Sequence, residues 1–154
     1  GRHLVDTDER IMAHADMPVS DIVAQNGWSY FRKLEKQVLS ETAAASRLVV
    51  ATGGGIVLDP ENRAILEDPA HFTVWLQAAP ETIEKRMKAD AQSATLRPAL
   101  TESLLALEIA DTLAARNPYY ESARDMAIDT DRLSAAEICE LIVKEISNAR
   151  QHFR

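Results

Sequence analysis

The chain has 154 residues, of which 46% are hydrophobic and 27% charged, and its formal net charge at pH 7 is −7. These values predict one globular domain over residues 1–154. The negative charge argues against non-specific binding to nucleic acids or to anionic membranes. No apolar run approaches the roughly 18 residues of a membrane span, and no secretory signal opens the sequence.

The sequence contains one cysteine, Cys139, within an apolar run near the C-terminus. A lone cysteine excludes an intrachain disulfide and fits a reducing compartment. Free cysteines in apolar runs are usually buried, so we expect a thiol packed in the core. We therefore expect a cytoplasmic protein with no membrane or nucleic-acid partner.

Four short apolar runs predict strands, at residues 3–5, 47–52, 72–77 and 125–129. The second and third runs are almost wholly apolar, which is typical of parallel strands covered on both faces. Helical spacing predicts a helix between the first two strands, with Trp28, Tyr30 and Phe31 as core or pocket wall. The alternation of strands with helices favours a three-layer α/β domain with a parallel sheet.

Capping residues predict where the later helices begin. Asp59 precedes Pro60, an N-cap followed by proline at the first helical position, and Pro80 repeats that kind of start. Ser134 and Glu137 have the spacing of a capping box ahead of the C-terminal helix. The polar segment at 87–100 has no periodicity and is expected to be a lid loop over a site.

Candidate site residues follow the first two predicted strands. The first ends in Asp-Thr-Asp, and we expect alternation to place Asp6 and Asp8 on one side, where they could hold a metal through water and accept a proton. Capping of the next helix is the alternative. The second ends in Gly53, Gly54 and Gly55, without the lysine and hydroxyl of a phosphate-binding loop. Their amides could bind an oxygen-rich small molecule, or the glycines could simply form a tight turn.

Three arginines stand beside aromatic residues or prolines in this acidic chain: Arg32, Arg97 and Arg116. Each alone could be a surface ion pair. Together with the carboxylates and glycines they indicate an anion-binding pocket, because arginine grips carboxylates and phosphates with a planar fork. The four histidines are scattered without a zinc-binding motif, so no zinc site is expected.

Taken together, these motifs resemble one family along essentially the whole chain. The segments are VDTDERI, DIVAQNGWSYFRKLEKQVL, VVATGGGIVLDPENR, VWLQAAPETIEKRM, LRPAL and LAARNPYY, in the order and at about the spacing found in shikimate kinase. The resemblance implies a three-layer P-loop kinase fold, like that of nucleoside-monophosphate kinases. It also implies an enzyme that transfers the γ-phosphate of ATP, with Mg²⁺, to the 3-hydroxyl of shikimate in aromatic amino-acid biosynthesis, and we expect a monomer.

The resemblance also implies roles for individual residues. Asp8 would be the base, Asp6 would support magnesium, and Glu35 would orient Arg32. Arg32 and Arg116 would bind the shikimate carboxylate, and the backbone of Gly53, Gly54 and Gly55 would contact the substrate ring. Arg97 would contact the transferring phosphate, and Arg86 would lie near adenine. Such an arrangement suits phosphoryl transfer, which depends on positioning and positive charge.

The sequence departs from the family at two places. The lid motif is Arg-Pro-Ala-Leu, where the family usually has Arg-Pro-Leu-Leu. The family also has a strand, a G-x-x-x-x-G-K-[ST] loop and a helix before the point that corresponds to Gly1. We therefore expect an N-terminally incomplete domain that is inactive as it stands. Its sheet would lack the first central strand, which lies in the family between the strands at 47–52 and 72–77. The alternative is a genuine truncation that borrows a strand or rearranges.

Two other functions remain open from the sequence. A module of the same fold could bind a ligand without catalysis, although retention of Asp8 favours an enzyme. A related small-molecule kinase could act on another substrate such as gluconate, although the paired arginines and the glycine triplet favour a carboxylated ring.

Overall fold

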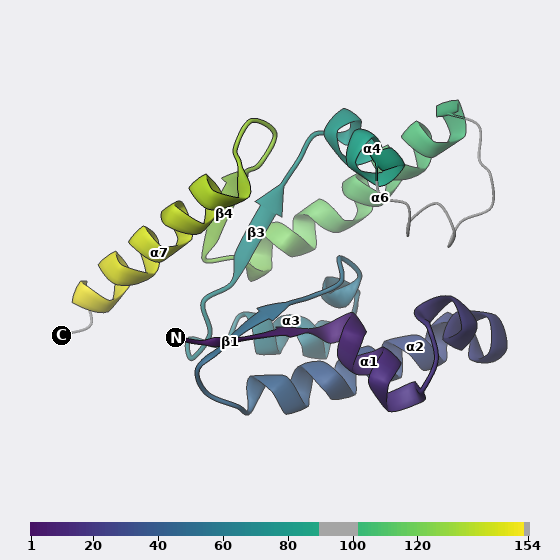
Figure 1. The fold of residues 1–154 in the computed structure, drawn as a ribbon, viewed down its shortest axis with the longest axis horizontal. Coiled ribbons are helices and arrows are strands. Elements are labelled where there is room, and N and C mark those ends of the chain that lie inside the picture. The colour runs from purple at the N-terminus through teal and green to yellow at the C-terminus, as the bar shows by residue number, and fades with distance from the viewer. Residues whose placement is uncertain (90–101, 153–154) are drawn as a thin grey trace. The chain divides into compact units, whose positions relative to one another are not determined.

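The structure is a computed structural model that describes residues 1–89 and 102–152. The chain divides into two compact units, Gly1–His71 and Phe72–Arg154, which are described separately below. The four predicted strands all form, as two separate two-stranded parallel ladders (Figure 1). Among the described residues, β1 pairs with β2 and β3 pairs with β4.

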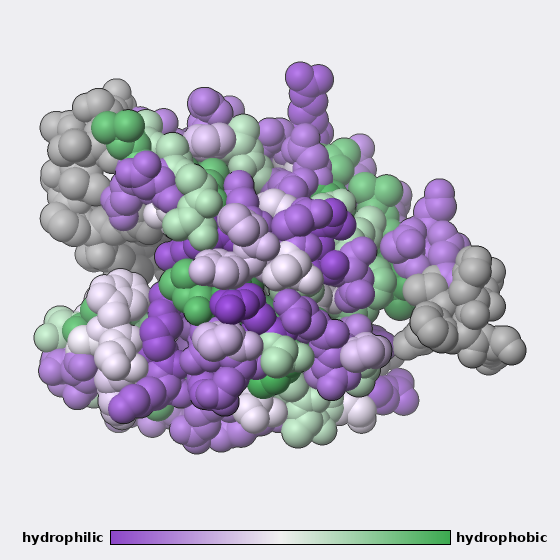
Figure 2. Space-filling model, turned by 180° about the vertical axis from the view of Figure 1, so that it is seen from behind, coloured by the Kyte–Doolittle hydropathy of each residue, from purple (hydrophilic) through white to green (hydrophobic). Residues whose placement is uncertain are grey.

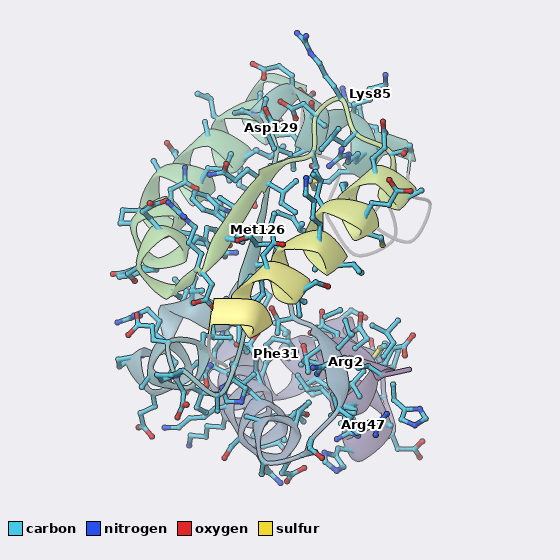
Figure 3. All side chains as sticks on the ribbon, turned by 90° about the vertical axis from the view of Figure 1, so that its left-hand side faces the viewer. Arg2, Phe31, Arg47, Lys85, Met126 and Asp129 are labelled. Atoms are coloured by element: carbon cyan, nitrogen blue, oxygen red, sulfur yellow. The ribbon has the colours of Figure 1, made fainter. Side chains whose placement is uncertain are left out.

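The first unit contains one ladder and its helices. In chain order its elements are β1 (His3–Asp6), α1 (Thr7–Ala15), α2 (Val19–Ala43), β2 (Leu48–Ala51), the 3-10 helix η1 (Ile56–Leu58) and α3 (Pro60–Leu66). β1 pairs with β2 from His3 opposite Leu48 to Asp6 opposite Ala51, so both strands end at the same edge. Figure 3 labels Arg2 and Arg47, where this ladder begins.

The core of the first unit lies between α1 and α2. Its buried members are Ile11 from α1 and Ile22, Phe31 and Val38 from α2. The prediction that the second strand is covered on both faces is wrong, because the side chain of Val49 is 52% exposed. The buried cluster is formed by the two helices, and among the described residues β2 pairs with β1 alone.

The second unit contains the other ladder. Its elements are β3 (Val74–Gln77), α4 (Pro80–Ala89), α6 (Glu102–Ala123), β4 (Met126–Asp129) and α7 (Ala135–His152). β3 and β4 pair in parallel from Val74 opposite Met126 to Gln77 opposite Asp129, and Figure 3 labels both ends of β4. Leu76 on β3 is 55% exposed, so the prediction of a strand covered on both faces is wrong here too.

Several local predictions are confirmed. The Asp59 carboxylate accepts a hydrogen bond from the Glu61 amide at the start of α3. Ser134 and Glu137 form a capping box in which the Glu137 carboxylate accepts from the Ser134 amide and the Ser134 hydroxyl accepts from the Glu137 amide. The sequence did not predict α6, which continues through Pro118. Residues 87–89 of the expected lid end α4, and 90–100 lie outside the described residues.

One burial prediction is wrong. Cys139 is exposed on α7, because Ile138 and Ile142 are the half-buried residues of this stretch, whereas Cys139 lies on the stripe that carries the 64% exposed Val143. Of the three aromatic residues predicted as core or pocket wall, Phe31 is buried in the core, and Trp28 and Tyr30 are exposed.

Hydrophilic side chains cover most of the face drawn in Figure 2, with apolar groups in small patches between them. None of the helices in residues 1–89 and 102–152 is long and apolar enough to span a bilayer.

Candidate functional site

The first group of site residues lies at the junction of β1 and α1. Asp6 ends the strand and is the N-cap of α1, and its Oδ1 accepts hydrogen bonds from the amides of Asp8 (2.8 Å) and Glu9 (3.2 Å). Asp8 therefore lies in the first helical turn. The strand alternation expected for the two aspartates is wrong, and the capping alternative is the one that forms, because the chain turns helical at Thr7.

Asp8 carries a half-buried carboxyl group with unused hydrogen-bonding capacity. Its Oδ1 is buried and has no hydrogen-bond partner among the described residues. Burial raises the pKa of Asp8 above its usual value, the nearby Asp6 raises it further, and Arg32 opposes this shift. A carboxylate in this state can accept a hydrogen bond, or a proton, from a hydroxyl group placed against it.

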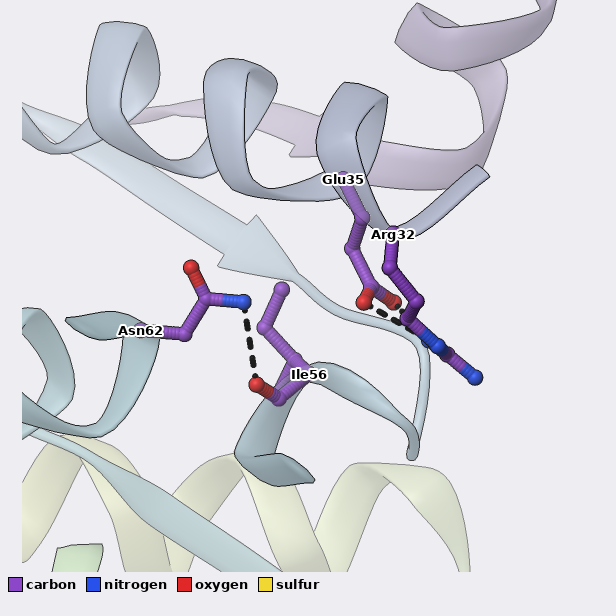
Figure 4. Close-up of polar contacts among 4 residues, drawn as sticks. All are labelled: Arg32, Glu35, Ile56 and Asn62. Atoms are coloured by element: carbon purple, nitrogen blue, oxygen red, sulfur yellow. Dashed lines mark hydrogen bonds and ion pairs between the residues drawn. The ribbon is translucent and has the colours of Figure 1, made fainter. Parts of the chain in front are cut away.

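Arg32 and Glu35 form a fixed ion pair on α2. Arg32 Nη1 donates to both carboxylate oxygens of Glu35, at 2.7 Å to Oε1 and 2.6 Å to Oε2 (Figure 4), and Glu35 is only 1% exposed. The guanidinium carbon lies 5.4 Å from the ring centre of Trp28 and 5.3 Å from that of Phe31. These contacts hold the guanidinium in one orientation and leave it partly exposed, so it can receive an anion.

The glycine loop brings backbone against these charged side chains. A Cβ on Gly53 would lie 3.3 Å from Asp8 Oδ1 and 3.7 Å from Glu35 Oε1, and a Cβ on Gly55 would lie only 2.3 Å from Arg32 Nη1 and Nη2. The φ of Gly55 is −81°, which any residue can adopt. Gly55 is therefore required by the space that the guanidinium occupies rather than by its backbone angles.

Sequence reasoning missed two residues of this region. Gly27 interrupts α2 with φ 80° and ψ 167°, a conformation that glycine alone adopts readily, and so separates the helix start from the segment that carries Arg32. The Asn-Gly dipeptide at 26–27 was the available signal. Asn62 is fully buried behind the glycine loop, and in the sequence it looked like an ordinary residue in the first turn of a helix.

The structure brings together Asp6, Asp8, Arg32, Glu35 and the glycines at 53–55, all within the first unit. The other predicted arginines belong elsewhere in the chain.

In the second unit, Arg86 links α4 to the end of β4. Its Nη1 donates to Thr130 Oγ1 at 2.9 Å, and its Nη2 donates to the Thr130 carbonyl at 2.7 Å. Arg116 lies half-buried on α6, and Arg97 falls outside the described residues. In residues 1–89 and 102–152 no three His, Cys, Asp or Glu side chains converge as a metal site.

Comparison with known proteins decides the family. The family model described as shikimate kinase matches residues 1–147. The chain belongs to the shikimate kinase family. Among curated shikimate kinases, that of Symbiobacterium thermophilum is 38% identical over 146 residues, covering 95% of this chain and 82% of the relative. Shikimate kinase 2 of Pectobacterium atrosepticum is 37% identical over 142 residues, covering 92% and 80%.

Solved shikimate kinases have the same fold. The enzyme from Acinetobacter baumannii in complex with shikimate matches with a TM-score of 0.86 and 27% identity, over 97% of this chain and 80% of that one. The enzyme from Bacteroides thetaiotaomicron matches with a TM-score of 0.82 and 25% identity, over 97% and 84%. The predicted P-loop kinase fold is thereby confirmed.

As a shikimate kinase, the protein is a phosphotransferase of aromatic biosynthesis that uses ATP as its phosphate donor. The two alternatives left open by the sequence, a ligand-binding module and a kinase for a substrate such as gluconate, are not favoured.

Proposed function

We propose that this shikimate kinase transfers the γ-phosphate of ATP to the 3-hydroxyl of shikimate, with Asp8 as the base. The supporting observation is the half-buried Asp8 carboxyl group, whose Oδ1 has no protein partner among the described residues. A substrate hydroxyl would supply the missing hydrogen bond and, during transfer, the proton.

The transfer of the phosphoryl group needs no reactant besides shikimate and ATP. Asp8 accepts the hydroxyl proton, the hydroxyl oxygen bonds to the γ-phosphorus, and the bond from that phosphorus to the β,γ-bridging oxygen breaks, so that ADP leaves. Because the pKa of Asp8 is raised, the carboxylate is a stronger base than an exposed aspartate and stays ionised above that pKa.

Arg32 would receive the shikimate carboxylate and so orient the ring toward Asp8. This role is supported by the contacts that Glu35 and two aromatic rings make with its guanidinium, which hold the group in place. Family membership supports a second contact to this carboxylate from Arg116. The backbone of Gly53, Gly54 and Gly55 would border the ring, because glycine at 53 and 55 lets the main chain lie directly against Asp8 and Arg32.

The phosphate donor would be met by other cations. Arg97 would contact the transferring phosphate, and Arg86 would lie near adenine. Mg²⁺ commonly binds through one or two carboxylates together with phosphates and water, and Asp6 and Asp8 could supply those carboxylates. The described residues contain no cluster of three protein ligands, which suits an ion bound mainly by the nucleotide. When bound, Mg²⁺ neutralises charge on the phosphates, and Asp6 would hold it through its water shell.

We further propose that the enzyme acts as a monomer in the cytoplasm on shikimate and ATP, without a nucleic-acid partner. Its single cysteine and its net charge of −7 support this assignment.

A coupled assay for ADP release on the purified full-length gene product tests the proposal. We expect turnover that depends on shikimate and is lost in Asp8→Asn, while shikimate still binds. If folded wild-type protein releases no ADP with shikimate, the proposed reaction is wrong. If Asp8→Asn keeps its chemistry at saturating shikimate and loses only binding, Asp8 is not the base.

A further inference from the structure

We propose that Asn62 is a positioning residue that fixes the glycine loop against the guanidinium of Arg32. Asn62 lies on α3, is fully buried, and reaches the main chain immediately after the loop, where its Nδ2 donates to the Ile56 carbonyl at 3.1 Å (Figure 4). This inference rests on the proposed function, because Arg32 is there the group that receives the substrate carboxylate.

The segment after the glycines is held tightly. The Ile56 amide donates to the Gly53 carbonyl at 3.1 Å, and the Leu58 amide donates to the Gly55 carbonyl at 3.0 Å. Ile56 and Val57 are buried, so the turn is held by packing as well as by hydrogen bonds. The conformation of the loop therefore depends on where residues 56–58 are fixed.

α3 supplies side chains that fix these carbonyls. Asn62 binds the carbonyl of Ile56, and the next residue, Arg63, donates from Nη1 to the carbonyls of Val57 (2.7 Å) and Leu58 (3.3 Å). Asn62 and Arg63 thus hold three consecutive carbonyl groups from one turn of α3. Of the two, Asn62 acts on the residue directly bonded to Gly55.

A small displacement of the loop would be felt at Arg32. The guanidinium packs against Gly55 so closely that a single added carbon would lie 2.3 Å from two of its nitrogens. Glu35 also holds this guanidinium, at 2.6 and 2.7 Å from Nη1. Both contacts limit where the guanidinium can lie, so Asn62 acts on it through Ile56 and Gly55 without touching it.

The remaining amide atom of Asn62 distinguishes this role from simple stabilisation. Oδ1 is buried and has no hydrogen-bond partner among the described residues, and an unpaired buried polar atom lowers stability. An apolar side chain of similar volume would remove that penalty but would lose the donor to Ile56. The presence of an amide side chain at this position is therefore explained by its hydrogen bond to the Ile56 carbonyl.

The test compares Asn62→Leu with Thr42→Val in the purified protein. Thr42 is an equally buried residue of the same unit, and its hydroxyl also donates to a main-chain carbonyl, that of Val38 within α2. We expect Asn62→Leu to raise KM for shikimate about tenfold, with kcat and KM for ATP little changed, because a misplaced Arg32 weakens binding in the ground state and the transition state alike. Thr42→Val should lower Tm without changing KM.

Amide hydrogen exchange supplies a readout that does not depend on activity. The Ile56 and Leu58 amides should exchange faster in Asn62→Leu than in wild type or in Thr42→Val. Asn62→Ala, which adds no bulk, is made in parallel in case leucine is not accommodated.

An unchanged KM with unchanged exchange at residues 56 and 58 would overturn the role of Asn62. Faster exchange in a protein whose wild type lacks shikimate-dependent turnover would refute the proposed function but keep the link from Asn62 to the loop.

Discussion

Replacement of Gly55 by alanine tests how closely Arg32 depends on the glycine loop. The backbone angles of Gly55, φ −81° and ψ −8°, suit alanine, so the fold should tolerate the change and gain about 0.4–1 kcal/mol through the unfolded state. The new methyl group would lie 2.3 Å from Nη1 and Nη2 and 2.5 Å from Cζ of Arg32. These distances must open to at least 3.4 Å, the lower limit of ordinary contact.

The atoms that must yield belong to the end of a flexible side chain. The guanidinium therefore retreats by about 1 Å, a misplacement that can cost up to about a hundredfold when it affects a positioned group. We expect KM for shikimate to rise ten- to a hundredfold, on the order of 1.4–2.7 kcal/mol in binding free energy, with kcat less affected. Steady-state kinetics with varied shikimate and a thermal melt measure the two effects.

A double-mutant cycle gives the decisive control. In an Arg32→Ala background the added methyl has no guanidinium to displace, so Gly55→Ala should cause little further loss. A full additional rise in KM in that background would refute the idea that Gly55 acts through Arg32. An unchanged KM in the single variant would show that the close approach has no functional role.

Three further predictions concern the same unit. Burial raises the pKa of Asp8, so the folded state favours the neutral acid, and this group's contribution to stability is present at low pH and lost as pH rises through the folded pKa. Asp8→Asn should therefore abolish turnover yet raise stability at pH 7 by about 1 kcal/mol, discounted for half exposure. Equal or lower stability in chemical denaturation would contradict this. The same pKa predicts that wild-type kcat/KM falls as pH drops through it, and a profile flat down to pH 4 would exclude Asp8 as the base. Gly27→Ala should destabilise the protein by about 1–3 kcal/mol, since alanine strains at φ 80°, and a Tm unchanged by the substitution would refute that strain.

Features set by neighbouring residues were predictable from the sequence. The four strands follow from short apolar runs, and the caps at Asp59 and Ser134 follow from side chains that reach amides two or three residues away. The Arg32–Glu35 pair was expected from the family resemblance, and its i, i+3 spacing brings the two side chains to one face of α2.

Features set by the rest of the fold were not predictable in this way. Apolar character alone suggested covered strands and a buried Cys139, but burial depends on which elements pack against each face. The amide of Asn62 binds a carbonyl six residues earlier, across a turn whose path local patterns do not define. The glycines were expected to admit a substrate, and only the structure shows Asp8 and Arg32 packed against two of them.

The support of Arg32 also bears on how a ligand is recognised. A free arginine side chain loses about 2 kcal/mol of rotamer entropy when it is immobilised. Here Glu35, Trp28 and Phe31 restrict the guanidinium through contacts within the chain, so that loss falls largely on folding. If Arg32 receives the shikimate carboxylate as proposed, inhibitors that keep a rigid carboxylate in register with it should gain affinity from a side chain that need not rearrange.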